Sequence, residues 1–218
     1  MKERFYQPEY FVKEGGYSFE RSEKIHYYCV QRYFPEIIAR RGEVLDVLDV
    51  GCACGGLLKS FPEKWGKYGV DISGFAIENA KTSLAMPDHF QQMNVDDGIA
   101  LPDDKFDYVF LFDVIEHLNN PISVLKNIHR ILKSGGQILL TTPNLRSLDR
   151  LLHSKTWSGV EDASHVLLYT PYALQFALMR AGFQIIQSFS PFYNWPRWID
   201  DVLRRWHLGG TLWTLAKK

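Results

Sequence analysis

The stretch VLDVGCACGG (residues 47–56) decides the fold of this chain. Its first four residues are apolar apart from Asp49 and are typical of a buried β-strand. The glycines and small residues that follow predict a loop that opens a helix. Such residues let the backbone approach a bound molecule closely, and the N-terminus of the helix favours an anionic group. The stretch therefore predicts a strand–loop–helix unit that binds a ligand.

A second acidic residue stands at the end of the next predicted strand. Asp71 follows Gly51 by 20 positions and lies in the apolar run YGVDI (68–72). A carboxylate at this place can accept hydrogen bonds from both hydroxyl groups of a ribose. The loop and Asp71 together predict a half-sheet that binds a nucleoside.

Two classes of ligand compete for this half-sheet. Gly51, Ala53 and Gly56 fit a loose dinucleotide pattern, which favours NAD or FAD. Asp49 argues against this alternative, because a dinucleotide fold has no general use for a charge two residues before the first glycine. The same carboxylate suits a ligand that carries an amino group and a cationic sulfonium.

Short apolar runs alternate with helical patterns along the chain. The predicted strands are 43–51, 68–72, 106–112 and 136–142. Their apolar residues are continuous rather than alternating, as expected when both faces of a sheet are covered. Helical spacing is found at 18–41, 73–85 and 121–133. Alternating strands and helices predict a parallel sheet with helices on both faces.

The end of the chain departs from this alternation. We expect a helix at 171–181 and strands at 183–189 and 211–218. The residues between the two strands leave room for one short helix but not for a long crossover. Antiparallel pairing of the last two strands is therefore expected.

Composition and charge narrow the class of protein. Of the 218 residues, 46% are hydrophobic and 23% are charged, as in an ordinary globular domain. Basic and acidic side chains both number 25, and this balance argues against a dedicated nucleic-acid-binding protein. No apolar run reaches the roughly 20 residues of a membrane-spanning helix, and the charged start is unlike a secretory signal. We therefore expect a single-domain cytoplasmic protein.

Several segments resemble, in order, the motifs of class I S-adenosylmethionine-dependent methyltransferases. They are VLDVGCACGG, YGVDIS, LPDDKFDYVFLFDVIEHLNNP and LKNIHRILKSGGQILLTTPN, followed by HVLLYTPYALQFALMRAGFQII. Within this family the chain is most similar to ubiquinone-biosynthesis type O-methyltransferases. The resemblance implies an α/β, Rossmann-like three-layer sandwich whose seven-stranded, mostly parallel sheet has an antiparallel last strand. The chain departs from the family at Ala53, where glycine is more common.

The resemblance also implies how S-adenosylmethionine would be bound. The methionine end would be held by loop residues and closed in from below by the end of the fourth strand; these residues are Asp49, Gly51, Cys52, Ala53, Gly55, Phe112 and Asp113. Asp71 would bind the ribose hydroxyls, and Ile72 would lie against the adenine. Asp96 would accept the adenine amino proton, with the neighbouring Asp97 as the alternative.

Methyl transfer needs an aligned acceptor and exclusion of water, and a hydroxyl acceptor also benefits from a general base. The candidate bases are His117, just past the fourth predicted strand, and His165 in the later DASHVLLY segment. Glu116 could act as a base or orient a histidine. Tyr169 would share a helical face with His165 if that stretch is helical. A structural role is the alternative for each residue.

The cysteine pair Cys52 and Cys54 raises the question of a metal. Zinc usually takes four ligands, and the sequence has no second cysteine pair or H-x₃₋₅-H cluster to complete the set. Both cysteines are therefore interpreted as small loop residues, and no metal site is expected.

The segment after the fifth predicted strand and the N-terminal segment are candidates for contact with a substrate or the cofactor. Residues 145–164 are expected to form either a mobile lid or an extra packing helix. The N-terminal aromatics are expected to fold over the cofactor; they are Tyr6, Tyr10, Phe11 and Tyr17.

A helix near the C-terminus carries an apolar face, formed by Trp198, Ile199, Val202, Leu203 and Trp206. The face could rest on a membrane surface, cover a lipid-like substrate or simply pack on the protein. Asp200 and Asp201 weaken the attraction to anionic lipid.

The sequence thus predicts a methyltransferase that uses S-adenosylmethionine to methylate a small molecule at oxygen. The acceptor could be a phenol, a quinone precursor, a sugar or a lipid-linked glycan. An NAD(P)-dependent oxidoreductase and a non-catalytic cofactor- or partner-binding domain are the alternatives. The expected parts of the single domain (1–218) are a helical cap (1–42), a cofactor-binding core (43–144), the lid (145–164) and a C-terminal region (165–218).

Overall fold

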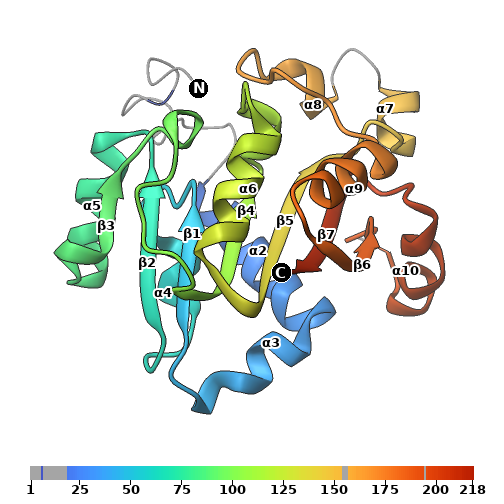
Figure 1. The fold of residues 1–218 in the computed structure, drawn as a ribbon. Coiled ribbons are helices and arrows are strands. Elements are labelled where there is room, and N and C mark those ends of the chain that lie inside the picture. Colours follow the sequence, from blue (N-terminus) through green and yellow to red (C-terminus); the bar gives the residue numbers. More distant parts are fainter. Residues whose placement is uncertain (1–5, 7–18, 154–156, 194) are drawn as a thin grey trace.

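The computed structural model describes residue 6 and residues 19–153, 157–193 and 195–218. The described strands form one seven-stranded sheet in the order β3-β2-β1-β4-β5-β7-β6 (Figure 1). They are β1 (Asp46–Val50), β2 (Gly66–Asp71), β3 (Phe90–Gln92), β4 (Phe106–Phe112), β5 (Leu132–Pro143), β6 (Gln184–Phe189) and β7 (Thr211–Lys217). The predicted α/β fold with a seven-stranded, mostly parallel sheet is confirmed.

The sheet is parallel except at β7, which lies antiparallel between β5 and β6. Leu139 of β5 faces Leu215, and Phe189 of β6 faces Trp213. In the described part of the connection between β6 and β7, the helices are the short α10 (Arg197–Leu203) and η6 (Arg204–Trp206). The predicted antiparallel pairing is therefore confirmed, and β6 ends at the same sheet edge as the parallel strands.

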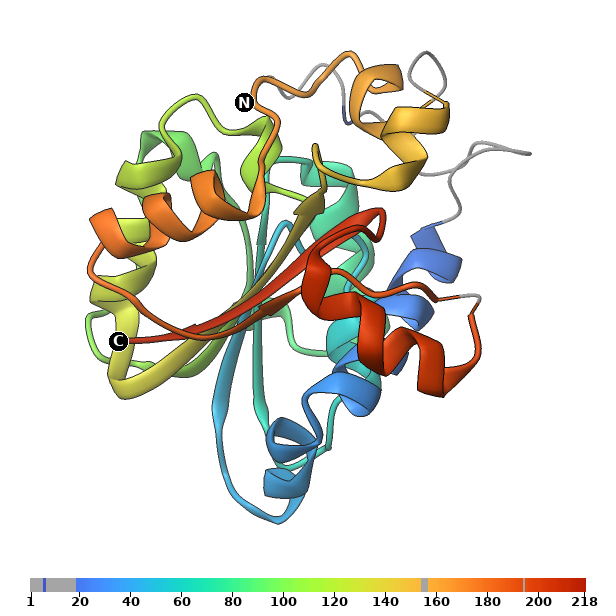
Figure 2. The ribbon, with the colours of Figure 1, turned by 90° about the vertical axis from the view of Figure 1, so that its right-hand side faces the viewer.

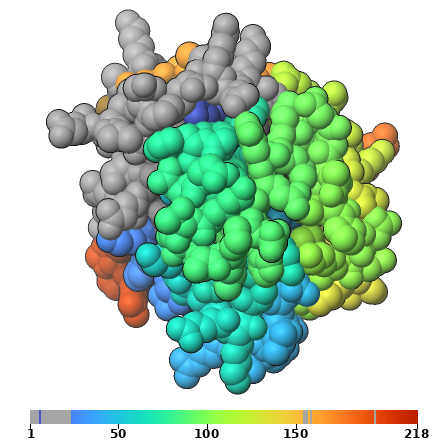
Figure 3. Space-filling model, turned by 90° about the vertical axis from the view of Figure 1, so that its left-hand side faces the viewer, coloured from blue at the N-terminus to red at the C-terminus, as the bar shows by residue number. Residues whose placement is uncertain are grey.

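Helices cover both faces of the sheet, as Figure 2 shows from the side. One face carries α2 (Phe19–Tyr33), α3 (Pro35–Ala39), α4 (Gly56–Ser60) and α5 (Gly74–Leu84). The other carries α6 (Pro121–Ile131) and α9 (Pro171–Arg180). The β3 edge is the side seen in Figure 3, where teal and green residues form much of the described surface.

Burial on both faces explains the continuous apolar runs. In β4, Val109 and Leu111 join the core under α6 and α9, whereas Phe110 and Phe112 join the core under α2 and α4. The second core is rich in aromatic rings, and Phe61 stacks on Phe110 with ring centroids 4.8 Å apart. Alternate residues of each strand thus serve different cores.

The region after β5 forms two short helices above the carboxyl edge of the sheet, α7 (Leu148–Leu152) and α8 (Ser158–Glu161). From α8 to α9 the chain forms no helix. Tyr169 forms an isolated parallel bridge with Asn144. The suggestion that Tyr169 shares a helical face with His165 is therefore wrong. Within the described ranges, no helix has both the length and the apolar character needed to cross a bilayer.

Candidate active site

The glycine-rich loop after β1 has the backbone that its composition predicts. Gly51 and Gly55 both have φ of +81°, in the region that favours glycine. A Cβ on Gly51 would lie 2.3 Å from Cγ2 of Val114, so this backbone packs closely against the turn after β4. Ala53 has φ of +46°, in the left-handed region that is less favourable for alanine than for glycine.

Asp71 ties the loop to the end of β2. Its Oδ2 accepts the backbone N–H of Ala53 at 2.9 Å, and its Oδ1 accepts that of Ser73 at 2.8 Å. Burial raises the pKa of Asp71, although these hydrogen bonds act in the opposite direction. Each carboxylate oxygen keeps a further lone pair, so the group can still accept ribose hydroxyls. Ile72 is buried beside it.

Asp49 and Cys52 are both buried, Asp49 near the carboxyl end of β1 and Cys52 in the loop that follows. Asp49 is buried in β1, in register with Gly69 of β2 and Phe110 of β4. Cys52 is also buried, and burial raises the pKa of its thiol well above the usual value. A protonated, enclosed thiol is a poor metal ligand and nucleophile. The structure agrees with Cys52 as a small loop residue.

The choice between Asp96 and Asp97 was left open by the sequence. Both lie in η4 (Val95–Asp97), after β3. Asp96 is partly buried and accepts hydrogen bonds from the backbone N–H groups of Asn119 and Asn120 and from the Asn119 side chain. Asp97 is exposed and accepts from Asn94 Nδ2 at 2.8 Å. The role of either residue toward adenine stays a prediction.

The end of β4 is held by a residue that the sequence analysis missed. His26, from α2, places Nε2 3.2 Å from Oδ2 of Asp113, and its ring lies 4.8 Å from that of Phe112. Thr141 donates to Oδ1 of Asp113 at 2.9 Å. Burial alone would raise the pKa of Asp113, but these hydrogen bonds outweigh it and lower the pKa. A lone histidine in a helical segment carries no signal of such a contact.

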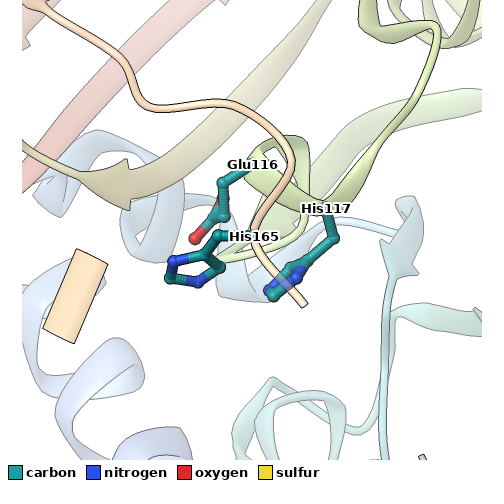
Figure 4. Close-up of side chains that lie close together, drawn as sticks. All are labelled: Glu116, His117 and His165. Carbon is teal, nitrogen blue, oxygen red and sulfur yellow. The ribbon is translucent and has the colours of Figure 1, made fainter. Parts of the chain in front are cut away.

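Glu116, His117 and His165 lie close together, although they come from two distant segments (Figure 4). One potential ligand atom of each lies within 4.8 Å of the others. Glu116 and His117 belong to η5 (Ile115–His117), directly after β4. The backbone N–H groups of Val166 and Leu167 donate to the carbonyl oxygen of Glu116, which places His165 beside this turn. All three predicted catalytic candidates are thus brought together.

Each histidine of the cluster is oriented through Nδ1. His165 Nδ1 lies 2.9 Å from the carbonyl oxygen of Gly159, and His117 Nδ1 lies 3.0 Å from Oγ of Ser164. That hydroxyl in turn donates to Oδ1 of Asp162 at 2.5 Å. The DASH segment contained both partners, but the sequence analysis singled out only its histidine.

Glu116 is almost completely buried at 1% exposure. Its Oε2 accepts from Thr142 at 3.0 Å, whereas Oε1 has no hydrogen-bond partner among the described residues. Burial raises the pKa of Glu116 well above its usual range, and the charge of Asp113 raises it further. Burial also lowers the pKa of His117, as does the neighbouring His165. Both shifts favour the neutral forms of Glu116 and His117.

Tyr6 links this cluster to the cofactor edge. Its ring lies 6.1 Å from that of His117. Burial raises the pKa of the Tyr6 phenol to about 12, and the charges of Asp162, Asp71 and Glu116 contribute to the increase. The phenol is therefore within electrostatic range of both the predicted ribose site and the cluster. Tyr10, Phe11 and Tyr17 lie outside the described residues.

Comparisons with known proteins agree with this arrangement. A family model described as a methyltransferase domain matches residues 21–188. The chain is 34% identical over 107 residues to the ubiquinone biosynthesis O-methyltransferase of Haemophilus ducreyi, covering 45% of each protein. It is 33% identical over 115 residues to the 2-methyl-6-phytyl-1,4-hydroquinone methyltransferase of Synechocystis sp., covering 51% of this chain and 36% of that protein. The alignments span less than half of these relatives.

The fold is also found among solved structures. A SAM-dependent methyltransferase from Archaeoglobus fulgidus is similar with a TM-score of 0.68, covering 99% of both chains at 21% identity. At that identity the likeness establishes the fold and not the substrate.

Proposed function

The chain belongs to the class I S-adenosylmethionine-dependent methyltransferases, and we propose that it transfers the methyl group to an oxygen atom of a small molecule. The buried cluster of Glu116, His117 and His165 is the observation that carries the choice of oxygen. A hydroxyl acceptor must lose a proton, and this cluster offers groups that can take it. Membership of this family does not support the oxidoreductase alternative.

The residues at the sheet edge fit S-adenosylmethionine. The close approach of the Gly51 backbone to Val114 leaves no room for a side chain, and Asp71 retains lone pairs for two ribose hydroxyls. We assign the methionine end to the loop and to Asp113, and the adenine to Ile72 and Asp96. The remaining predicted contacts are Asp49, Cys52, Ala53, Gly55 and Phe112.

The bound cofactor supplies a methyl group that its sulfonium has already activated. The acceptor oxygen forms a bond to the methyl carbon while the carbon–sulfur bond breaks, and its electron pair stays on sulfur. The hydroxyl proton passes to the cluster, where His117 is held by Ser164 and Asp162. The main tasks of the chain are to align the acceptor and to exclude water.

We propose a phenol or hydroquinone as the acceptor. The names of the relatives from Haemophilus ducreyi and Synechocystis refer to ubiquinone biosynthesis and to a hydroquinone. A phenolic hydroxyl is acidic enough for a histidine to assist its ionisation. Gly159, in the region after β5, contacts His165 of the cluster through its carbonyl oxygen, which supports the proposal that the described part of residues 145–164 acts as a lid.

Exposed apolar side chains in α10 and η6 support a contact with an anionic membrane surface or with a lipid-like acceptor on that surface. Trp198 and Val202 of α10 and Trp206 of η6 are 73%, 61% and 63% exposed, so these side chains do not pack on the protein. Exposed Arg197 and Arg205 supply positive charge beside them.

The two aspartates of α10 are engaged within the protein. Buried Asp200 accepts from Arg32 at 2.9 Å and Tyr33 at 2.7 Å, which fixes α10 to α2. Asp201 is paired with Arg204. Both carboxylates are thus charge-compensated, and they oppose anionic lipid less than the sequence suggests.

Vesicle flotation tests this surface. We expect the chain to bind phosphatidylglycerol vesicles more than phosphatidylcholine vesicles. Replacing both Trp198 and Trp206 by serine should reduce binding at least about tenfold, because each large apolar side chain contributes roughly 1.5–3 kcal/mol when buried. The matched control replaces exposed Tyr172 and Phe176 of α9 by serine and should bind normally. No binding to anionic vesicles, or equal losses in both variants, would refute the proposal.

Calorimetric titration with S-adenosylhomocysteine, with NAD and NADP in parallel, tests the proposed function. We expect binding of S-adenosylhomocysteine alone. Phenols, hydroquinones and sugars would then be screened with S-adenosylmethionine for release of S-adenosylhomocysteine. Binding of a nicotinamide cofactor instead would overturn the proposal, and binding of none would favour a non-catalytic domain.

A further inference from the structure

We propose that Glu116, His117 and His165 form a binding site for a divalent transition-metal ion of the zinc type. The three side chains offer one carboxylate oxygen and two imidazole nitrogens, which all lie within 4.8 Å of one another. In the part of the chain that the structure describes, this is the one group of three such side chains at ligand spacing. The sequence predicted no metal site, because the cysteines lacked further ligands. The proposed site uses none of the cysteines.

The tautomers of the two histidines suit a metal. His165 Nδ1 faces the carbonyl oxygen of Gly159, which can only accept, so Nδ1 carries the hydrogen. His117 Nδ1 faces Ser164 Oγ, whose own hydrogen is donated to Asp162. In each neutral ring the lone pair is therefore on Nε2. Metal-binding histidines commonly donate their other ring N–H to a carbonyl, a carboxylate or a similar acceptor in this way.

The third side chain provides an independent observation. Oε1 of Glu116 is buried and has no hydrogen-bond partner among the described residues, although Oε2 accepts from Thr142. A buried carboxylate oxygen without a partner is costly and is uncommon in proteins. A cation bound between Glu116 and the histidines would satisfy this oxygen.

The donor set indicates the type of ion. Imidazole nitrogens suit zinc, iron, nickel and copper, whereas magnesium and calcium prefer sites made only of oxygen. Two histidines and one carboxylate also leave a coordination position open, as in catalytic zinc sites. Ligands at about 2.0–2.1 Å from zinc lie about 3.3 Å apart, so side-chain rotation would draw the three groups together around the ion.

The open position would accept a hydroxyl oxygen. With an ion bound, the histidines would be ligands and could not also take the proton; the cation would instead lower the pKa of a coordinated hydroxyl, so that solvent could accept its proton. Metal binding itself is independent of the reaction; only this use of the ion rests on the proposed function.

Titration of the chelator-stripped full chain with Zn²⁺, with Mg²⁺ in parallel, tests the site. We expect one Zn²⁺ per chain and much weaker binding of Mg²⁺. Co²⁺ in place of Zn²⁺ should give visible absorption bands that report its coordination. Failure to bind Zn²⁺, or equal binding of Mg²⁺, would overturn the proposal.

Two variants identify the ligands. His165→Ala should weaken Zn²⁺ binding at least about tenfold, because even the outer partners of metal ligands contribute 10- to 100-fold. Glu116→Gln keeps the shape of the side chain and should have a similar effect. His153→Ala is the matched control, since His153 is an exposed histidine of the neighbouring segment paired with Asp149. Unchanged Zn²⁺ affinity in both ligand variants would refute the site.

The two proposals fail in different ways. Full methyl transfer by the stripped protein would remove the catalytic role of the ion and leave the proposed function intact. Binding of Zn²⁺ that depends on His165 and Glu116 would support the metal site even if no hydroxyl compound is methylated.

Discussion

Replacing His117 by alanine should lower the rate of methyl transfer by about 100- to 10,000-fold, the range for loss of a general base. The ring is buried beside Glu116 and His165 and oriented by Ser164, so water cannot easily take its place. Whether His117 accepts the proton or holds a metal ion, its loss removes the group that prepares the acceptor oxygen. The rate would be measured as release of S-adenosylhomocysteine with the acceptor found by screening.

The affinity for S-adenosylhomocysteine should not change in the His117 variant, because the cofactor is assigned to other residues. His165→Ala should behave in the same way. His129→Ala is a suitable control, since the partly buried His129 lies on α6 against Phe183, on the face of the sheet opposite α2. Full activity in both the His117 and His165 variants would end the assignment of the cluster to catalysis.

Replacing Asp71 by alanine should weaken binding of S-adenosylhomocysteine roughly 10- to 150-fold, as expected for about 1.5–3 kcal/mol of hydrogen bonds to a charged group. Two effects contribute. The ribose hydroxyls lose their acceptor, and the loop loses the contact between Asp71 and the Ala53 N–H at 2.9 Å. Calorimetric titration measures the change in affinity.

Two controls accompany this prediction. Asp97→Ala removes an exposed carboxylate from the same sheet edge and should leave the affinity unchanged if Asp96 contacts the adenine. Thermal unfolding of Asp71→Ala without ligand reports how much of the change is due to the loop. A folded Asp71→Ala protein that binds with wild-type affinity would contradict the ribose assignment.

The fold could be predicted because its signals are local. The run at 106–112 is apolar throughout, and the structure shows alternate residues of β4 entering two different cores. The antiparallel β7 followed from the length of the connection from β6. The exposure of α10 could not be predicted, because the apolar pattern placed Trp198 and Ile199 on one face, whereas the structure leaves Trp198 exposed and Ile199 partly buried.

By itself, the sequence determined six of the seven strands, the glycine-rich loop and the position of Asp71, because each depends on residues close together in the chain. The strand β3 was not among the predicted strands, since it has only three residues and one buried side chain. The tertiary structure alone decided that His26 reaches Asp113 and that His165 lies beside Glu116 and His117. Hydrogen bonds from Val166 and Leu167 to the Glu116 carbonyl make the second contact, and these are backbone groups that no side-chain pattern encodes. The orphan oxygen of Glu116 is likewise a property of packing, since burial depends on every segment that closes around a residue.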